Sequence, residues 1–184
     1  ILKGARIRTE ILCDELTVPD DIGTPPGVVI HPNFSKRELT EAITEIPGSH
    51  CAGCHEPLIN PVGFPSETFD ALGRHRTAEL LYDDNGVEQY RVRVHTDTVP
   101  RIDPSDPDTV MNAIELGQLV GTSPKTSSCF ARHYYRFSQR RMEVDSTDLC
   151  EVNMLEEALA SDGLQGMLKA AVLLPEFKLR AMPN

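Results

Sequence analysis

Residues 49–58, SHCAGCHEPL, constrain the fold of this chain more than any other stretch, because Cys51, Cys54 and His55 form a C-x-x-C-H pattern. This spacing is typical of covalent c-type haem attachment. Each of the two thiols can bond one vinyl group of a haem, and the adjacent histidine can then ligate the iron. We therefore predict one covalently attached haem c, with Cys51 and Cys54 as anchors and His55 as the proximal iron ligand. A short helix should carry the motif, since positions i and i+3 share a helix face.

Two other uses of a C-x-x-C pair explain the sequence less well. A thioredoxin-type redox pair needs a strand before the motif and a long helix after it, whereas here a Gly-Ser-His turn precedes it and Pro57 follows closely. A structural zinc site needs a second pair of ligands at short spacing. The remaining cysteines, Cys13, Cys129 and Cys150, stand alone in the sequence.

The composition is that of an ordinary soluble globular protein, with 40% hydrophobic and 25% charged residues. No apolar run reaches the roughly 18 residues of a membrane-spanning helix, so no membrane span is expected. The net charge of −10 argues against nucleic acid as a partner and favours a basic redox partner protein.

Bacterial C-x-x-C-H thiols receive their haem outside the energy-transducing membrane, so the motif predicts export to the periplasm or the cell exterior. The first residues, ILKGARIRTEILC, lack the layout of a leader peptide, begin without Met and have the hydrophobic spacing of a helix. We expect this chain to be a segment of a longer exported protein.

Hydrophobic spacing and turn residues predict a mainly α fold, a c-type cytochrome-like haem domain with a β-hairpin insertion plus a C-terminal helical subdomain. Asn85-Gly86 marks the hairpin within residues 79–95, and Ser35 with Glu38 forms a capping box that opens a helix. The Pro-rich segment 17–33 should be extended. Further helices are expected at residues 1–13, 64–73, 109–120, 127–139, 148–160 and 164–174. The Asp-rich loop near 101–108 predicts a boundary between a haem-bearing domain, 1–100, and a helical domain, 101–184.

The ligand on the distal side of the iron is left open by the motif. Met142 lies in a loop between two expected helices, where its thioether could face the iron and Arg140 or Arg141 could reach a haem propionate. We take Met142 as the first choice and His95, at the end of an expected strand, as an alternative, whereas His133 lies on an apolar stripe where a core histidine is the default interpretation.

Two aromatic residues that follow the motif, Phe64 and Phe69, are spaced to present apolar surface to the haem, although ordinary core packing explains them equally well.

Three cysteines remain in an oxidising compartment once the haem pair is set aside. Cys129 and Cys150 lie near the starts of two expected neighbouring helices, which favours a Cys129–Cys150 disulfide. Cys13 would then be left over, either buried or paired with sequence outside this chain.

The run CAGCHEPLINPVGFPSETFDALGRHR resembles the planctomycete-type cytochrome domain, third kind. That signature is C-x-x-C-H followed by D-P-x-G-F, an acidic residue before F-D and a final G-R-x-R; here Asn60 stands where the family usually has Asp. The later run CFARHYYRFSQRR…DSTDLC…LKAAVLLPEFKLR resembles the small helical domain of unknown function that follows it, with Arg140-Arg141 in place of its usual G-R ending. The resemblance implies a haem, export and a position at the C-terminal end of a large multidomain protein.

These features together predict a monohaem c-type cytochrome module that transfers electrons to a redox partner protein or to upstream domains of the same polypeptide. It is expected to be an electron carrier more than a catalyst by itself. The alternative is the haem-bearing part of a larger oxidoreductase whose substrate site lies in other sequence or in a partner subunit.

Overall fold

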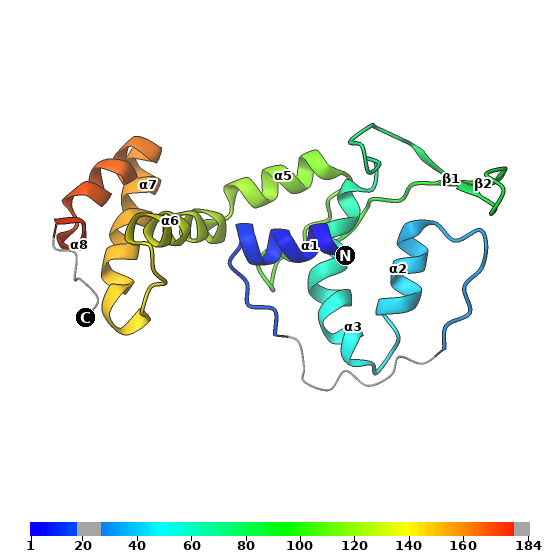
Figure 1. Cartoon of the computed structure of the whole chain (residues 1–184), viewed down its shortest axis with the longest axis horizontal. Coiled ribbons are helices and arrows are strands. Elements are labelled where there is room, and N and C mark those ends of the chain that lie inside the picture. The colour runs from blue at the N-terminus through cyan, green and yellow to red at the C-terminus, as the bar shows by residue number, and fades with distance from the viewer. Residues whose placement is uncertain (18–26, 179–184) are drawn as a thin grey trace. The chain divides into compact units, whose positions relative to one another are not determined.

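The structure is a computed structural model that describes residues 1–17 and 27–178. It is mainly helical with one small antiparallel hairpin, as predicted (Figure 1). Its internal contacts divide it into two compact units, 1–121 and 122–184. The predicted boundary between a haem-bearing domain, 1–100, and a helical domain, 101–184, stays a prediction.

The first unit holds most of the elements, which follow one another along the chain. They are α1 (Leu2–Arg6), the π-helix η1 (Ile7–Ile11), α2 (Lys36–Thr44), α3 (His50–Cys54), the π-helix η2 (His55–Ile59), α4 (Asn60–Gly63), the 3₁₀-helix η3 (Phe64–Ser66), β1 (Ala78–Tyr82), β2 (Glu88–Arg93) and α5 (Ala113–Thr122). The second unit holds α6 (Pro124–Gln139), α7 (Asp145–Leu173) and α8 (Pro175–Lys178). Within the described residues, no helix is both long and apolar enough to cross a membrane. The Pro-rich segment predicted to be extended lies partly outside the described residues, as do the last residues of the second family-like run.

A buried arginine holds the N-terminal helices in place. Arg8 is 1% exposed and donates hydrogen bonds to the carbonyl oxygens of Leu58 (3.0 Å), Pro100 (2.5 Å) and Arg101 (2.9 Å). Its charge is paired with the Asp14 carboxylate at 3.1 Å. Burying a guanidinium is favourable only when its charge is paired and its donors are bonded, and here the charge is paired and four of the five N–H groups donate a hydrogen bond. Arg8 therefore joins η1, the end of η2 and the loop that follows β2.

Gly4 allows the backbone of α1 to approach closely the backbone at the end of η2 and in α4. A Cβ atom at Gly4 would lie 2.0 Å from the carbonyl oxygen of Ile59, and one at Gly63 would lie 3.5 Å from the Gly4 nitrogen. Only a residue without a side chain fits at Gly4. The rod formed by α3, η2 and α4, cyan in Figure 1, is thus fixed against the N-terminal helix.

The core of the first unit lies next to this contact. Its buried hydrophobic residues are Leu12, Val62, Ile102, Val110, Leu116 and Val120. Since Ile102 and Val110 belong to it, the Asp-rich loop starts and ends in the core of the first unit.

The capping box at the start of α2 is confirmed. The Ser35 hydroxyl accepts a hydrogen bond from the Glu38 backbone N–H at 3.2 Å, and Glu38 accepts one from the Ser35 N–H at 2.7 Å. Buried Glu79 on β1 accepts the Lys36 N–H at 3.0 Å and lies 3.5 Å from the Arg76 guanidinium. Carboxylates are favoured at a helix N-terminus, so Glu79 links the hairpin to α2.

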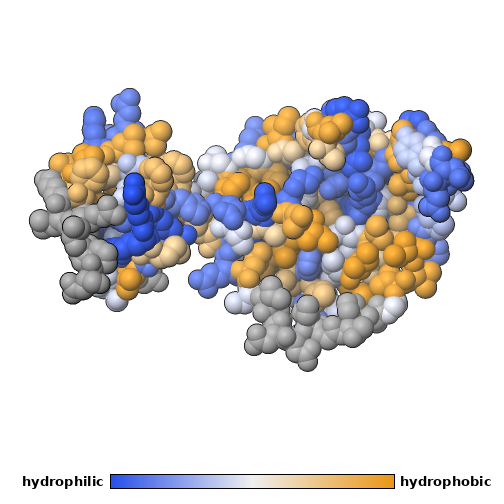
Figure 2. Space-filling model, in the orientation of Figure 1, coloured by the Kyte–Doolittle hydropathy of each residue, from blue (hydrophilic) through white to orange (hydrophobic). Residues whose placement is uncertain are grey.

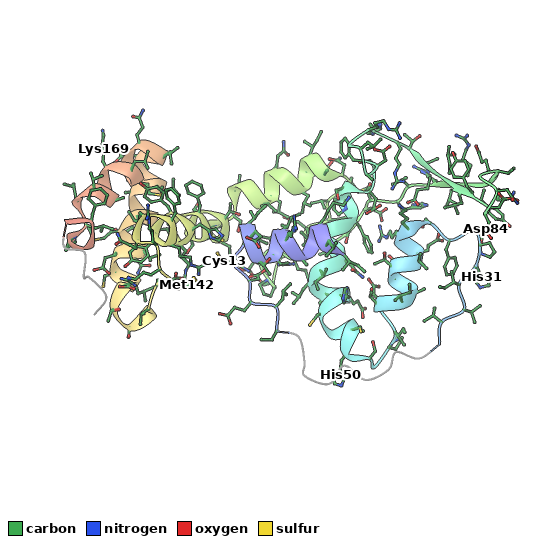
Figure 3. All side chains as sticks on the ribbon, in the orientation of Figure 1. Cys13, His31, His50, Asp84, Met142 and Lys169 are labelled. Carbon is green, nitrogen blue, oxygen red and sulfur yellow. The ribbon has the colours of Figure 1, made fainter. Side chains whose placement is uncertain are left out.

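The hairpin is confirmed as well. β1 and β2 pair antiparallel with Leu80 opposite Arg91, and the turn contains Gly86 at φ 78°. Figure 3 shows Asp84 at the tip of the hairpin.

The helix predicted at residues 64–73 is wrong beyond η3. The carboxylate of Asp70 accepts the backbone N–H groups of Leu72 (2.8 Å) and Arg74 (2.9 Å), and these bonds form a tight turn in place of helix. Side chains of this type compete with helical hydrogen bonds. Gly73 has the predicted positive φ, 75°, but in this turn.

The second unit packs α6 against α7. Its buried core consists of Ala131, Tyr135, Val152, Leu155, Met167, Ala171 and Leu174. Gly163 has φ 66° and ψ −160°, so it breaks α7 between the two helices predicted at 148–160 and 164–174.

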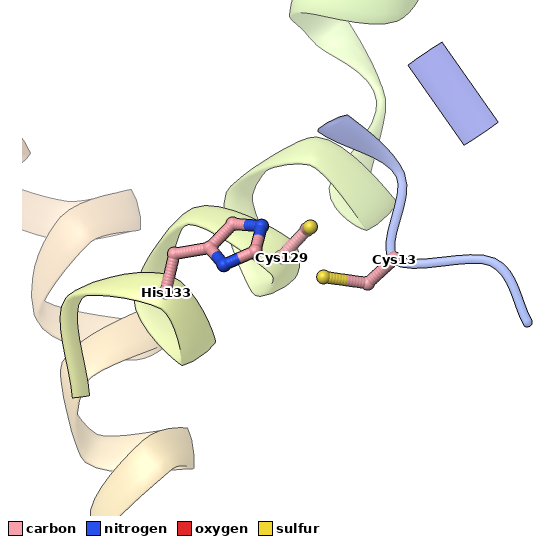
Figure 4. Close-up of side chains that lie close together, drawn as sticks. All are labelled: Cys13, Cys129 and His133. Atoms are coloured by element: carbon pink, nitrogen blue, oxygen red, sulfur yellow. The ribbon is translucent and has the colours of Figure 1, made fainter. Parts of the chain in front are cut away.

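The predicted Cys129–Cys150 disulfide is wrong. Cys150 is a free thiol on the exposed side of α7, whereas Cys129 is 1% exposed on α6 and is disulfide-bonded. Figure 4 shows Cys129 and His133 on successive turns of α6. In the first unit Cys13 is disulfide-bonded too, so it is not left over. Cys150 sits early on its helix as expected, but its side chain points to solvent rather than into the core.

An arginine–aspartate pair closes the segment between α6 and α7. The Arg141 guanidinium bonds both carboxylate oxygens of Asp148 and donates to the Tyr135 hydroxyl at 2.8 Å. Asp148 also accepts the Val144 N–H at 2.7 Å. The hydrogen bond from Arg141 is the main cause that holds the pKa of Asp148 well below its usual value of 3.8, although burial opposes the shift.

Replacing Arg8 with Met should lower the free energy of unfolding by about 2–4 kcal/mol, because three carbonyl oxygens and one carboxylate lose their partner while the side chain keeps its bulk. The measurement is urea unfolding followed by circular dichroism. Arg6→Met, on the exposed side of α1, is the matched control and should change little. Equal effects of the two variants would contradict the role given to Arg8.

Gly4→Ala should destabilise the chain by about 1–3 kcal/mol or more, because the new methyl group collides with backbone that cannot rotate away. Gly53→Ala is the control, since a Cβ atom there has nothing within 4 Å. Melting temperatures of both variants compare the two sites, and a Gly4→Ala protein as stable as Gly53→Ala would show that the close approach is absent.

The lowered pKa of Asp148 predicts that the chain loses stability in acid. Its pKa is lowered in the folded state, so its contribution is complete above about pH 4, the unfolded value, and is lost as the pH falls below that value. Between pH 6 and pH 3 the unaltered chain should lose about 1–2 kcal/mol more unfolding free energy than Asp148→Asn. Asp84→Asn, at the exposed hairpin tip, should follow the unaltered chain in the same urea titrations. Parallel pH profiles for the unaltered chain and Asp148→Asn would refute the prediction.

Candidate cofactor site

The C-x-x-C-H residues lie on a short helix whose start is fixed by a cap. The Ser49 hydroxyl accepts the Ala52 backbone N–H at 3.1 Å, which satisfies one of the free donors at the start of α3. Cys51 and Cys54 are free thiols, each half-buried, and are not joined to each other as an oxidised redox pair would be. The two thiols are therefore available on one short helix, three positions apart.

His55 begins a π-helical turn that brings it next to Asn60. The backbone N–H of Asn60 bonds the carbonyl oxygen of His55, an i to i+5 bond. In an α-helix residues five apart point about 140° away from each other, whereas the wider π turn places them nearly above one another. The Nδ1 atom of His55 is consequently 3.3 Å from the Oδ1 atom of Asn60.

Asn60 is fully buried and held from its other side by the end of α2. Its side-chain nitrogen donates to the Thr44 hydroxyl and to a Glu45 carboxylate oxygen, both at 2.8 Å. The site therefore uses two elements, with α2 supporting the side chain that contacts His55.

The donor set of these residues fits a c-type haem. The described hydrogen bond of His55 uses Nδ1, and within the described residues Nε2 has no hydrogen-bond partner, so Nε2 is available for a metal. Metal-binding histidines almost always make such a second hydrogen bond through the other ring nitrogen. Two free thiols, Cys51 and Cys54, accompany this imidazole.

The two aromatic residues predicted to face the haem occupy different surroundings. Phe64 is buried, with the Arg37 guanidinium 4.5 Å from its ring centroid. Phe69 is 40% exposed and makes an edge contact with the His75 ring at 5.8 Å. Core packing thus accounts for Phe64, and the haem contacts of both residues stay predictions.

The residues predicted for the distal side and a propionate lie in the second unit. Met142 is exposed in the segment between α6 and α7 (Figure 3), and the Arg141 guanidinium is bound to Asp148 and Tyr135. Arg140 is the left-handed C-cap of α6, at φ 54°. Met142 as distal ligand and Arg141 as a haem contact stay predictions.

Sequence reasoning gave no role to three residues of this site, Thr44, Glu45 and Asn60, although Asn60 was noted as standing where the family signature usually has Asp. The spacing of Asn60 from His55, five positions, matches neither an α-helical face nor a strand, so periodicity gives no signal for it. Pro57 and Pro61, which interrupt regular helical hydrogen bonding after the motif, are the one local hint of an altered turn.

Comparison with known proteins agrees with this description. Residues 1–79 match the family model PSCyt3, described as "Protein of unknown function (DUF1588)". No curated protein and no solved structure matches the chain. The match contains the whole of the site, from Thr44 and Glu45 through the C-x-x-C-H motif to Asn60. Residues 1–79 are therefore similar to PSCyt3, a planctomycete cytochrome c-type domain family.

Proposed function

We propose that this chain is a monohaem c-type cytochrome module that transfers electrons in an exported bacterial protein. The observation that carries the proposal is the donor set on one rod of helix, two free thiols followed at once by an imidazole whose Nε2 is available. The family model that residues 1–79 match supports the same chemistry.

Cys51 and Cys54 would hold the haem through thioether bonds, and His55 would ligate its iron through Nε2. A bound haem supplies a one-electron couple. The chain contributes the ligand, the hydrogen bond at Nδ1 and a partly buried surrounding that sets how strongly the imidazole donates.

Thioether attachment of haem takes place outside the bacterial cytoplasm, so the same proposal places the protein in the periplasm or the cell exterior. Its partner would be a redox protein or another domain of the same polypeptide. The net charge of −10 favours a basic partner surface, and it predicts that the rate of electron exchange falls as salt is added.

The alternative is the haem-bearing part of a larger oxidoreductase. The two are separated by reacting the reduced protein with carbon monoxide and by following electron exchange with a small basic cytochrome in a stopped-flow instrument. Fast exchange without carbon monoxide binding supports the carrier, whereas carbon monoxide binding with slow exchange supports the oxidoreductase.

The proposal predicts how the thiols behave when the chain is produced with a signal peptide and a c-type haem maturation system. The unaltered chain should keep haem on a denaturing gel, and Cys51→Ala with Cys54→Ala together should lose it. Each single variant should retain one thioether, which shifts the pyridine haemochrome band to longer wavelength. Cys150→Ala, which removes an exposed free thiol, is the control and should leave haem attachment unchanged. A chain that carries no covalent haem under these conditions would refute the proposal.

A further inference from the structure

The direction of every hydrogen bond around Asn60 can be worked out from its partners. The Thr44 hydroxyl donates its single hydrogen to the Thr40 carbonyl oxygen at 2.7 Å, so toward Asn60 it can only accept. The Glu45 carboxylate, when ionised, also can only accept. Both partners therefore require the NH₂ group of Asn60, and its carbonyl oxygen must be the atom that faces His55.

That orientation determines the tautomer of the histidine. A carbonyl oxygen at 3.3 Å from Nδ1 can only accept, so Nδ1 must carry the hydrogen and Nε2 must carry the lone pair. In a histidine side chain without such contacts, the hydrogen can lie on either ring nitrogen. The protein fixes it before any metal binds, because Asn60 is fully buried and held at both of its donor hydrogens.

Glu45 is the next residue in this row of hydrogen bonds, and we call Glu45, Asn60 and His55 the relay. Its negative charge polarises the Asn60 amide through the bond at 2.8 Å, which makes the amide oxygen a stronger acceptor for the Nδ1–H of His55. A stronger hydrogen bond at Nδ1 raises the basicity of the ring and so the donor strength of Nε2.

We propose that Asn60 is a positioning residue that fixes His55 as the Nδ1–H tautomer, and that Glu45 acts through it to strengthen Nε2 as an iron ligand. This inference rests on the proposed function, since it concerns the haem that His55 would ligate. A stronger donor stabilises ferric over ferrous iron and lowers the midpoint potential.

The test measures the midpoint potential of the haem-loaded full chain and, by NMR, the exchange of the Nδ1 proton of His55. Asn60→Leu removes the acceptor at similar volume and should raise the potential and speed the exchange. Glu45→Gln keeps an acceptor oxygen and removes the charge, so it should raise the potential by a smaller amount.

Two controls separate the relay from other effects. Val62→Ala opens space in the same helix, α4, and should lower stability without moving the potential. Glu56→Gln removes one negative charge beside His55, from an exposed side chain outside the relay, and should shift the potential less than Glu45→Gln does.

The inference is overturned when Asn60→Leu, still carrying haem, shifts the potential no more than Val62→Ala. It is equally overturned when Glu45→Gln shifts the potential no more than Glu56→Gln. If Asn60→Leu does not fold, this second comparison alone decides the test. A chain that carries no haem refutes the proposed function alone. The His55 tautomer of that chain is then read by long-range proton–nitrogen NMR, where Nδ1–H supports the role of Asn60 and Nε2–H overturns it.

Discussion

The first unit depends on the buried guanidinium of Arg8. Its N–H groups bond two separate backbone segments, at Leu58 and at Pro100–Arg101, with Asp14 as its counter-ion. The Leu58 carbonyl lies near the end of η2 and those of Pro100 and Arg101 lie in a loop, and Arg8 supplies each of the three with a donor. Because Leu58 lies within η2, the same side chain steadies the turn that carries His55.

π-helical turns recur where this unit needs unusual geometry. η1 precedes the left-handed Cys13, at φ 51°, and η2 connects the cysteine-bearing α3 to α4. Short π segments are often found at functional sites, because the wider turn changes which residues share a face. Here the change brings Asn60 to His55, and the result is a histidine with one nitrogen bonded and the other available.

The surface of the first unit is not dominated by charge, although the whole chain is acidic. Val29 (76% exposed), Ile30 and Ile43 are exposed hydrophobic residues, and Figure 2 shows hydrophobic side chains gathered over the region of α2 and the segment before it. Val29 and Ile30 lie within the Pro-rich segment, and Ile43 lies near the end of α2 with 41% of its surface exposed. The helix has the predicted cap, and the Ile43 side chain faces outward from it.

The sequence by itself determined the elements whose signals are local. The C-x-x-C-H spacing gave the candidate haem residues, Ser35 and Glu38 gave the cap of α2, and Asn85-Gly86 gave the hairpin, because each depends on residues within a few positions of one another. Tertiary structure decided what depends on contacts between distant segments. Asn60 meets Thr44 and Glu45 across a gap of fifteen or sixteen residues, and Cys150 proved to be a free exposed thiol although its position in sequence suggested a partner. Local pattern fixes which residues can act, whereas the contact of the end of α2 with Asn60 on α4 decides which nitrogen of His55 is hydrogen-bonded.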